Sequence, residues 1–116
     1  MALPDGRLIE PSAPLLRRFG IYGAKIVGTG YYRAGEWARP ERMELGLKRE
    51  PNNEHDSNAV ALMRGSRPQQ VGHVAKGQAR FVAKALDGGE VLVAHVIMGG
   101  DWVLITARER WEQLNR

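Results

Sequence analysis

Alternating apolar and polar residues predict that most of the chain forms β-strands. Short stretches with this period, or with a continuous apolar run of strand length, recur between clusters of turn-forming residues. The predicted strands begin at Lys25 and then cover residues 41–49, 58–64, 69–75, 91–97 and 102–108. The pattern therefore predicts six short strands.

One segment has the period of a helix instead. Between Ala79 and Leu86 the apolar residues recur at positions i, i+3, i+4 and i+7, and polar side chains occupy the other face. Gly88 and Gly89 follow, where a helix is expected to end. The tail, residues 109–116, predicts a further short helical turn. The only substantial predicted helix is therefore inserted after the fourth strand.

Six short strands with one inserted helix are typical of a small closed barrel, of the kind that binds oligonucleotides. A sandwich of two small sheets is the alternative. At 116 residues the chain is long enough for one domain with a single core. Residues 1–23, interrupted by Pro and Gly, are expected to form a loosely packed N-terminal arm with a helical turn at 15–19. Residues 24–116 are expected to form a mostly β, modified oligonucleotide-binding-like barrel.

A polar loop from Glu50 to Asn58 separates the second and third predicted strands. Its proline fixes one φ angle, and its Asn, Asp and Ser side chains can bond neighbouring backbone groups. These residues are ordinary turn formers, so the capping of turns is one interpretation of the loop. A rigid polar loop on a β scaffold is also a common place for a ligand. We therefore expect candidate chemistry here.

Composition narrows the classes of site and partner. The chain has no cysteine, which excludes disulfides, zinc fingers and thiol nucleophiles and fits a reducing compartment. It also lacks a secretory signal pattern and any apolar run long enough to span a membrane, so a soluble cytoplasmic protein without a membrane partner is expected. The net charge of +4 favours an anionic partner such as nucleic acid. Because the excess charge is spread along the chain, a basic patch has to be assembled by folding.

Several charged and imidazole side chains have simple structural interpretations. His73 and His95 lie within predicted strands, and we interpret them as structural histidines. Four basic residues are interpreted as solvated faces, with the extension of a backbone-binding surface as the alternative. They are Arg17, Arg18, Arg80 and Lys84.

Three stretches of the sequence resemble the HIRAN domain, a small β module found alone in bacteria and phages and fused to helicase-like remodelling ATPases in eukaryotes. They are Val27-Gly28-Thr29-Gly30-Tyr31-Tyr32, the run from Leu47 to Ala61 with its Arg-Glu-Pro-Asn-Asn and Asp-Ser-Asn-Ala-Val segments, and Gln70-Val71-Gly72-His73-Val74-Ala75-Lys76. The resemblance extends from about Lys25 to Arg108. It implies a modified oligonucleotide-binding barrel with a pocket for the free 3′ end of single-stranded DNA.

The resemblance also implies roles for individual residues of such a pocket. An aromatic side chain at the position of Tyr31 stacks on the terminal base, and an Asp at the position of Asp56 accepts a hydrogen bond from the 3′-hydroxyl. Stacking on a base contributes about 1–3 kcal/mol with any sequence, and a carboxylate accepts from a hydroxyl but repels a phosphate. Adjacent strand residues point to opposite faces, so at most one of Tyr31 and Tyr32 belongs to a core. Lys76 matches a basic position at the start of the helix and is expected to contact phosphate.

Two positions depart from the DNA-binding members of the family. Those members carry Arg just before the paired aromatics, where this chain has Gly30, and an aromatic where His55 stands. Imidazole can still stack on a base. Arg33 or Arg49 is then the candidate for the missing phosphate contact. The expected DNA-binding residues are Tyr31, Tyr32, Arg33, Arg49, Asn53, His55, Asp56 and Lys76.

Two other classes of function stay open at the level of sequence. A divalent-metal nuclease site on the barrel rim would use Glu50, His55, Asp56 and His73. A protein-interaction module would dock a helicase or nuclease partner through a strand edge or the loop at Trp37. We expect neither catalysis nor a cofactor or metal. The expected function is a single-stranded-DNA-binding module of DNA repair or replication-fork processing.

Overall fold

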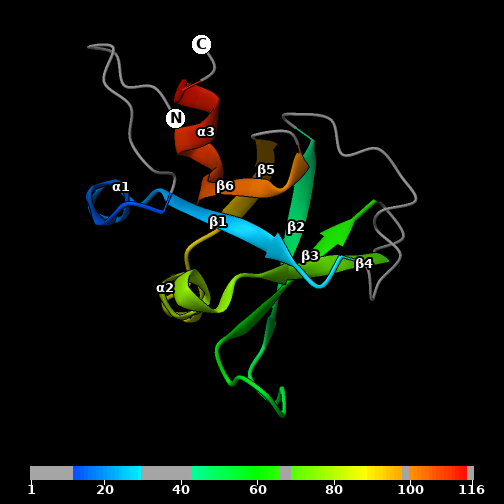
Figure 1. Cartoon of the computed structure of the whole chain (residues 1–116). Helices are drawn as coiled ribbons and strands as arrows, with labels where there is room; N and C mark the ends of the chain where they lie inside the picture. The colour runs from blue at the N-terminus through cyan, green and yellow to red at the C-terminus, as the bar shows by residue number, and fades with distance from the viewer. Residues whose placement is uncertain (1–11, 30–42, 66–68, 98–99, 115–116) are drawn as a thin grey trace.

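The computed structural model describes residues 12–29, 43–65, 69–97 and 100–114. Within these ranges antiparallel strands close into a barrel in the order β1-β4-β3-β2-β5-β6 (Figure 1). The strands are β1 (Tyr22–Val27), β2 (Glu44–Glu50), β3 (Ala59–Arg64), β4 (Gln69–Val74), β5 (Leu92–Ile97) and β6 (Trp102–Ala107). The predicted six-stranded, mostly β barrel is confirmed, and the alternative of a two-sheet sandwich is wrong.

Helices precede, interrupt and follow the strands of the described ranges. They are α1 (Pro14–Arg18) before β1, α2 (Lys76–Asp87) between β4 and β5, and α3 (Arg108–Leu114) after β6. α2 is the predicted amphipathic helix, with its first turn added ahead of the apolar period. α3 is a helix of 7 residues rather than a single turn. No helix in the described ranges is long and apolar enough to cross a membrane.

The first strand starts earlier than the sequence predicts. It begins at Tyr22 rather than Lys25, because residues 22–25 pair with Trp102–Ile105 of β6. This ladder holds Gly23 in extended backbone although glycine has a low strand propensity. The hydrogen bonds to β6 therefore keep Gly23 in the strand, although glycine locally favours a strand end.

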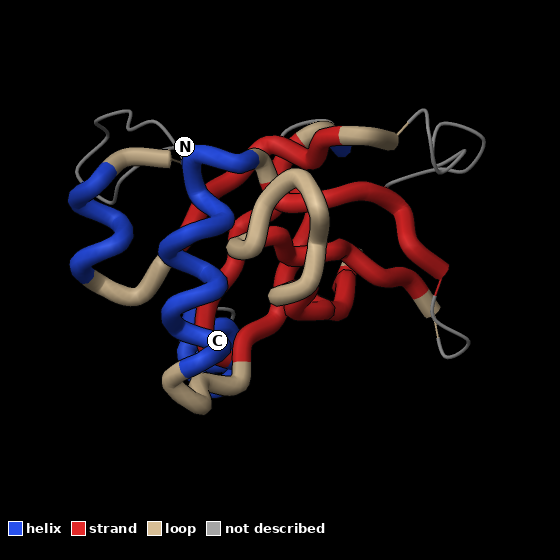
Figure 2. Tube along the Cα trace, turned by 90° about the horizontal axis from the view of Figure 1, so that it is seen from below, coloured by secondary structure: helices blue, strands red, loops and turns tan. Residues whose placement is uncertain are grey.

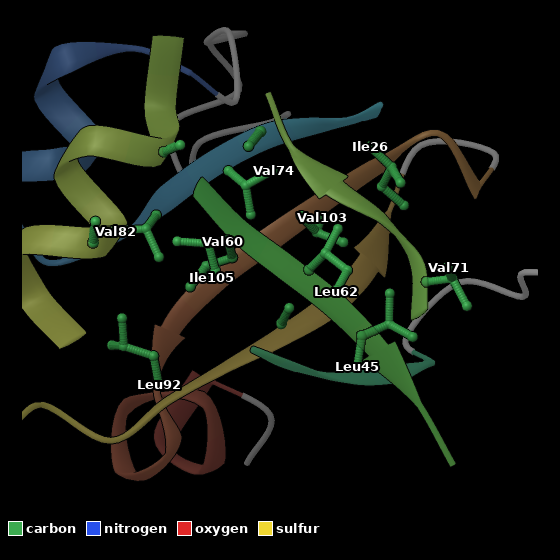
Figure 3. Close-up of a cluster of buried hydrophobic side chains, with 14 of the residues drawn as sticks. Ile26, Leu45, Val60, Leu62, Val71, Val74, Val82, Leu92, Val103 and Ile105 are labelled. Atoms are coloured by element: carbon green, nitrogen blue, oxygen red, sulfur yellow. The ribbon is translucent and has the colours of Figure 1, made fainter. Parts of the chain in front are cut away.

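Apolar side chains on the inner faces of the strands form the main core (Figure 3). Val60 and Leu62 of β3 lie beside Val103 and Ile105 of β6, and all four are fully buried. α2 contacts β1 and β3, and its Val82 joins the same cluster. Each Å² of apolar surface that is buried stabilises the fold by about 25 cal/mol, so this cluster is the main source of stability. α2 is therefore fixed to the barrel.

A smaller apolar cluster fixes the described end of the predicted arm. Leu16 of α1 packs with Leu104 of β6, and Trp111 of α3 lies against them. Seen from below, α1 and α2 lie side by side (Figure 2). Residues 12–23 therefore pack more closely than their Gly and Pro content predicts. The domain boundary after residue 23 stays a prediction.

Gly72 allows β1 and β4 to approach each other closely. A Cβ atom at this position would lie 2.7 Å from the carbonyl oxygen of Val27 and 2.9 Å from Cγ2 of Ile26. Real Cβ atoms do not tolerate such contacts with backbone, so only glycine fits here. The close approach brings Val27 and His73, which are register partners, to one end of the barrel.

Candidate nucleic-acid interface

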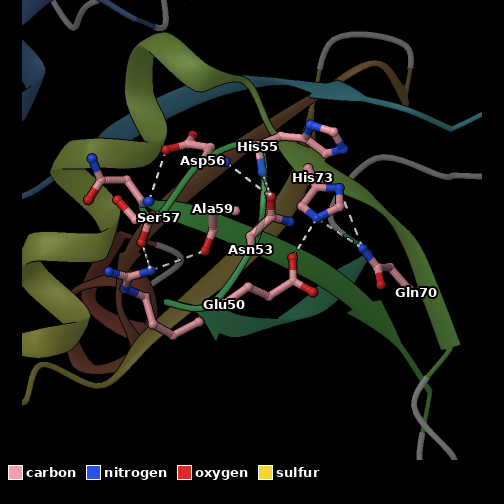
Figure 4. A network of polar contacts seen from close by, with 10 residues as sticks. Glu50, Asn53, His55, Asp56, Ser57, Ala59, Gln70 and His73 are labelled. Atoms are coloured by element: carbon pink, nitrogen blue, oxygen red, sulfur yellow. Dashed lines mark hydrogen bonds and ion pairs between the residues drawn. The ribbon is translucent and has the colours of Figure 1, made fainter.

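The loop between β2 and β3, residues 51–58, is held by its own side chains (Figure 4). Oδ1 of Asn53 accepts hydrogen bonds from the backbone N–H groups of His55 (2.9 Å) and Asp56 (3.1 Å). Oδ1 of Asp56 accepts one from the N–H of Asn58 (2.9 Å). Such local bonds replace the ladder bonds that the loop lacks. The predicted self-bonded loop is confirmed for Asn53 and Asp56.

Arg49 connects this loop to β2 and to the C-terminal end of α2. Its Nη1 donates to the carbonyl oxygen of Ser57 at 2.7 Å, and its Nε and Nη2 donate to the two carboxylate oxygens of Asp87 at 3.1 and 3.2 Å. The paired bonds to Asp87 are the fork geometry that Arg adopts with carboxylates. Arg49 thus positions the loop against α2, and its expected contact with a phosphate stays a prediction.

We expect Asn53→Ala to loosen the loop without unfolding the barrel. The substitution removes the acceptor for two backbone N–H groups, a loss that costs about 1 kcal/mol. Amide hydrogen exchange at His55 and Asp56 is then expected to rise by about fivefold. Asn52→Ala is the matched control, since Asn52 is exposed and none of the side-chain bonds of the described residues involves it. If the amides of His55 and Asp56 exchanged at the same rate in both variants, the bonds to Asn53 would not be what orders the loop.

A polar cluster lies behind the loop, between β2 and β4 (Figure 4). Nε2 of His73 lies 2.6 Å from Oε1 of Glu50, and the side-chain nitrogen of Gln70 lies 3.2 Å from the same ring nitrogen. Both the histidine and the glutamate are half-buried. His73 is therefore a hydrogen-bonded strand histidine, as the sequence predicts. No group of three or more His, Asp or Glu side chains in the described part of the chain could hold a metal ion.

A pocket of about 330 Å³ opens between the loop, the ends of β1 and β4, and the start of α2. It is lined by Val27, Asn53, His55, Asp56, Ala59, His73, Val74 and Lys76. Figure 2 shows the loop beside α2 at this end of the barrel. Four of the expected binding residues therefore meet in one pocket although they come from two segments of the sequence. Tyr31, Tyr32 and Arg33 lie outside the described residues.

The lining of the pocket includes both a carboxylate and a cation. Asp56 uses Oδ1 within the loop, whereas its Oδ2 makes no bond with the described residues and can accept one from a ligand. Lys76 is the first residue of α2, whose N-cap, Ala75, provides no side-chain cap. The positive end of the helix dipole therefore adds to the lysine charge. The pocket can therefore accept a hydrogen bond through Asp56 and attract an anion through Lys76.

The sequence did not indicate the apolar wall of the pocket. Val27 is 39% exposed at the end of β1, and Val74 lies near it on β4. Ile26 and Val27 pair with Val74 and His73, a register that local patterning does not define. The apolar run around Val27 was the only feature of the sequence that pointed to this wall, and a strand of the core would have the same pattern. Such a wall suits the flat face of a base or a sugar.

Comparison with known proteins decides the family. A model of the HIRAN domain matches residues 19–110. The chain belongs to the HIRAN family. The predicted resemblance is thereby confirmed, and the match includes every described residue of the pocket.

One curated relative of this HIRAN chain is a much longer protein. An Arabidopsis thaliana protein named as a SWI/SNF-related matrix-associated actin-dependent regulator of chromatin, subfamily A member 3-like 1, is 33% identical over 78 residues. The match covers 67% of this chain and 8% of that protein. The HIRAN chain thus corresponds to a small part of its relative.

Solved structures share the barrel, among them two of the HIRAN domain of human HLTF. The crystal structure of the HIRAN domain of human HLTF has a TM-score of 0.60 at 24% identity, covering 83% of this chain and 84% of that chain. The NMR structure of the HLTF HIRAN domain in its DNA-bound conformation has a TM-score of 0.51 at 24% identity, covering 84% of each chain. A protein from Lactobacillus plantarum has a TM-score of 0.59 at 21% identity, covering 72% of this chain and 86% of that chain. These likenesses establish the fold.

Proposed function

We propose that this HIRAN chain binds single-stranded DNA without catalysis and takes the free 3′ end of the strand into the pocket between loop 51–58 and α2. The observation that carries the proposal is that Asp56, with one carboxylate oxygen not bonded to the described residues, and the cation of Lys76 line the same pocket. A DNA 3′ end offers the complementary groups, a terminal hydroxyl donor and the nearest phosphodiester anion. The DNA-bound conformation solved for the HLTF HIRAN domain supports DNA as the ligand class.

Each side of the pocket has a defined task in this proposal. Oδ2 of Asp56 accepts the hydrogen bond of the 3′-hydroxyl, while Lys76 and the uncapped start of α2 hold the phosphodiester. The exposed imidazole of His55 stacks on or flanks the terminal base. Val27 and Val74 provide an apolar surface that any base can contact. The pocket therefore reads the end of a strand and not its sequence.

Selectivity follows from the charge of Asp56. A 3′-phosphate would bring two negative charges to a carboxylate whose position the loop fixes, and it has no hydroxyl to donate in that place. A blunt duplex holds its terminal base in the stack and cannot offer it to His55. We therefore expect a module that recognises free single-stranded 3′ ends, such as those formed in DNA repair and at stalled replication forks.

A fluorescence-anisotropy titration tests the proposal. The ligands are a short single strand with a free 3′-hydroxyl, the same strand with a 3′-phosphate, and a blunt duplex, each at low and moderate salt. We expect the free 3′-hydroxyl strand to bind most tightly and to keep its advantage as salt rises. Equal binding of all three, lost with salt, would reduce the chain to a nonspecific electrostatic binder. Absence of binding would favour a protein-interaction module that docks a helicase or nuclease.

A further inference from the structure

The exposed face of α2 carries a stripe of basic side chains that begins at the pocket. Lys76, Arg80 and Lys84 follow one another at intervals of four residues, and all three are exposed. Each step rises about 6 Å along the helix and turns by about 40°, so the stripe winds slowly around α2 over about 12 Å. No acidic residue occurs between Lys76 and Leu86. We call these three residues the α2 stripe.

The α2 stripe leads into a second hollow, where α2 faces α1 and the start of β1. This groove of about 540 Å³ is lined by Arg17, Tyr22, Phe81, Lys84, Ala85, Gly88 and Glu90. The guanidinium carbon of Arg17 lies 4.0 Å from the centre of the Phe81 ring, and that of Arg80 lies 4.7 Å from it. The ring thus holds two guanidinium groups in place. Nη1 of Arg17 donates to the carbonyl oxygen of Ser12 at 3.1 Å, which helps to fix this guanidinium group. Its other N–H groups and those of Arg80 can donate to phosphate oxygens.

The charges of the α2 stripe are not compensated within the described part of the chain. None of its three cations has an ion-pair partner among the residues that the structure describes. The nearest acidic residue along the helix, Asp87, is paired with Arg49 at 3.1 Å. Glu90 contributes a carboxylate at the far end of the groove. Like charges brought together repel one another, so an anion bound along the stripe relieves this repulsion.

We propose that the α2 stripe binds the phosphate backbone of the nucleotides on the 5′ side of the captured 3′ end and guides the strand into the Phe81 groove. This inference rests on the proposed function, because the strand starts in the pocket at Lys76. The cations recur with a rise of about 6 Å along α2, so a strand that follows the helix meets one cation after another. The length of the stripe suits two or three phosphates. An acidic peptide offers the same charge but has no reason to begin at the pocket.

The groove favours a strand that is held by phosphate contacts and aromatic surface together. Tyr22 lines it beside Lys84, and burial, followed by the charge of Glu90, raises the pKa of this tyrosine above its ordinary value. Its hydroxyl therefore stays protonated and can donate to a phosphate. The carboxylate of Glu90, which follows the C-terminal end of α2, repels the phosphate backbone. The strand is expected to leave the surface before that point.

The test is the salt dependence of binding to a decanucleotide with a free 3′-hydroxyl. The double variant Arg80→Gln, Lys84→Gln is expected to weaken binding about tenfold at low salt. The slope of log K against log salt should fall by about 1.4, because each lost phosphate contact on a single strand removes about 0.7. The preference for a 3′-hydroxyl over a 3′-phosphate should stay unchanged. The charge-matched control is Arg108→Gln, Arg110→Gln on α3, for which wild-type affinity is expected.

Three results would overturn the inference, and they are distinct from failure of the proposed function. In the first, the α2 and α3 double variants bind DNA with the same affinity and the same salt slope, and the preference for a 3′-hydroxyl persists. The pocket would then still bind the 3′ end, and the α2 stripe would have no part in binding. Another is a polyglutamate peptide that binds as tightly as the DNA and is lost in the same variant, which reassigns the stripe to a protein. The third is a stripe-dependent slope without any 3′-end preference, which separates the stripe from the pocket. Glu90→Gln should have the opposite effect on affinity: it removes a negative charge from the groove and should tighten DNA binding.

Discussion

Asp56→Asn is expected to reduce the preference for a free 3′-hydroxyl over a 3′-phosphate by about tenfold or more. A hydrogen bond to a carboxylate contributes about 1 kcal/mol more than one to a neutral amide, and repulsion of the terminal phosphate disappears with the charge. Affinity for the hydroxyl end should fall while affinity for the phosphate end rises. Asn can retain the bond from the Asn58 N–H, so the loop keeps its shape. Anisotropy titrations with the two strands measure the ratio.

Glu54→Gln is the matched control for this prediction. It removes the same charge from the same loop, and Glu54 is exposed and does not line the pocket. The control should preserve the ratio of the two affinities. If both variants changed the ratio equally, the effect would come from the net charge of the loop and the role of Asp56 as the hydroxyl acceptor would be wrong.

Trp111→Ala is expected to cost the largest amount of stability among the changes considered, about 3 kcal/mol. The Trp111 ring stacks on His95, with 3.6 Å between ring centroids and an interplanar angle of 10°. It also packs on the small cluster of Leu16, Ile21 and Leu104. The substitution therefore uncovers β5 and loosens both terminal helices. Urea unfolding at pH 8 measures the loss, with the exposed neighbour Glu112→Ala as the control.

The same ring makes stability depend on pH through His95. His95 is only 4% exposed, and this burial lowers its pKa from the ordinary value near 6.5, against an upward effect of Glu44 and with a further lowering by Arg108. The unfolded chain therefore binds a proton at higher pH than the folded chain does. The contribution of His95 is fully present above about pH 6.5 and is lost as the pH falls through the folded pKa. Unfolding free energies measured between pH 8 and pH 5 should decline in wild type.

Two variants separate this contribution from other groups that titrate. His95→Phe keeps a ring against Trp111 and removes the titrating group, so it should be close to wild type at pH 8 and should decline less on acidification. Trp111→Ala exposes His95 to water and should also flatten the profile, although from a lower starting stability. An undiminished decline in His95→Phe would assign the pH dependence to other residues.

Local patterning predicted those parts of the molecule that depend on local chemistry. The alternation of residues predicted the strands, the helical period predicted α2, and the Asn and Asp content of loop 51–58 predicted its internal bonds. The resemblance to HIRAN domains supplied the candidate pocket residues. Asn53, His55, Asp56 and Lys76 indeed line one pocket.

The features that the sequence could not predict are contacts between residues far apart in the chain. Arg49 pairs with Asp87, 38 residues away, and through this pair it connects the loop to the helix. His73 pairs with Glu50 across the intervening β3, 23 residues away. The stacking of Trp111 on His95 likewise depends on where α3 docks. Register and docking are set by the whole barrel, and no local period encodes them.

Closure of the barrel has a further consequence for how such a domain can be used in evolution. An open sheet leaves unpaired N–H and C=O groups along its outer strands, and these invite pairing with neighbouring chains and aggregation. Here each of the six strands has a hydrogen-bonded neighbour on both sides. The domain can therefore be joined to a long polypeptide, as in the Arabidopsis relative, without adding an unpaired strand edge that promotes aggregation. What it then offers to other molecules is its loops and its helix.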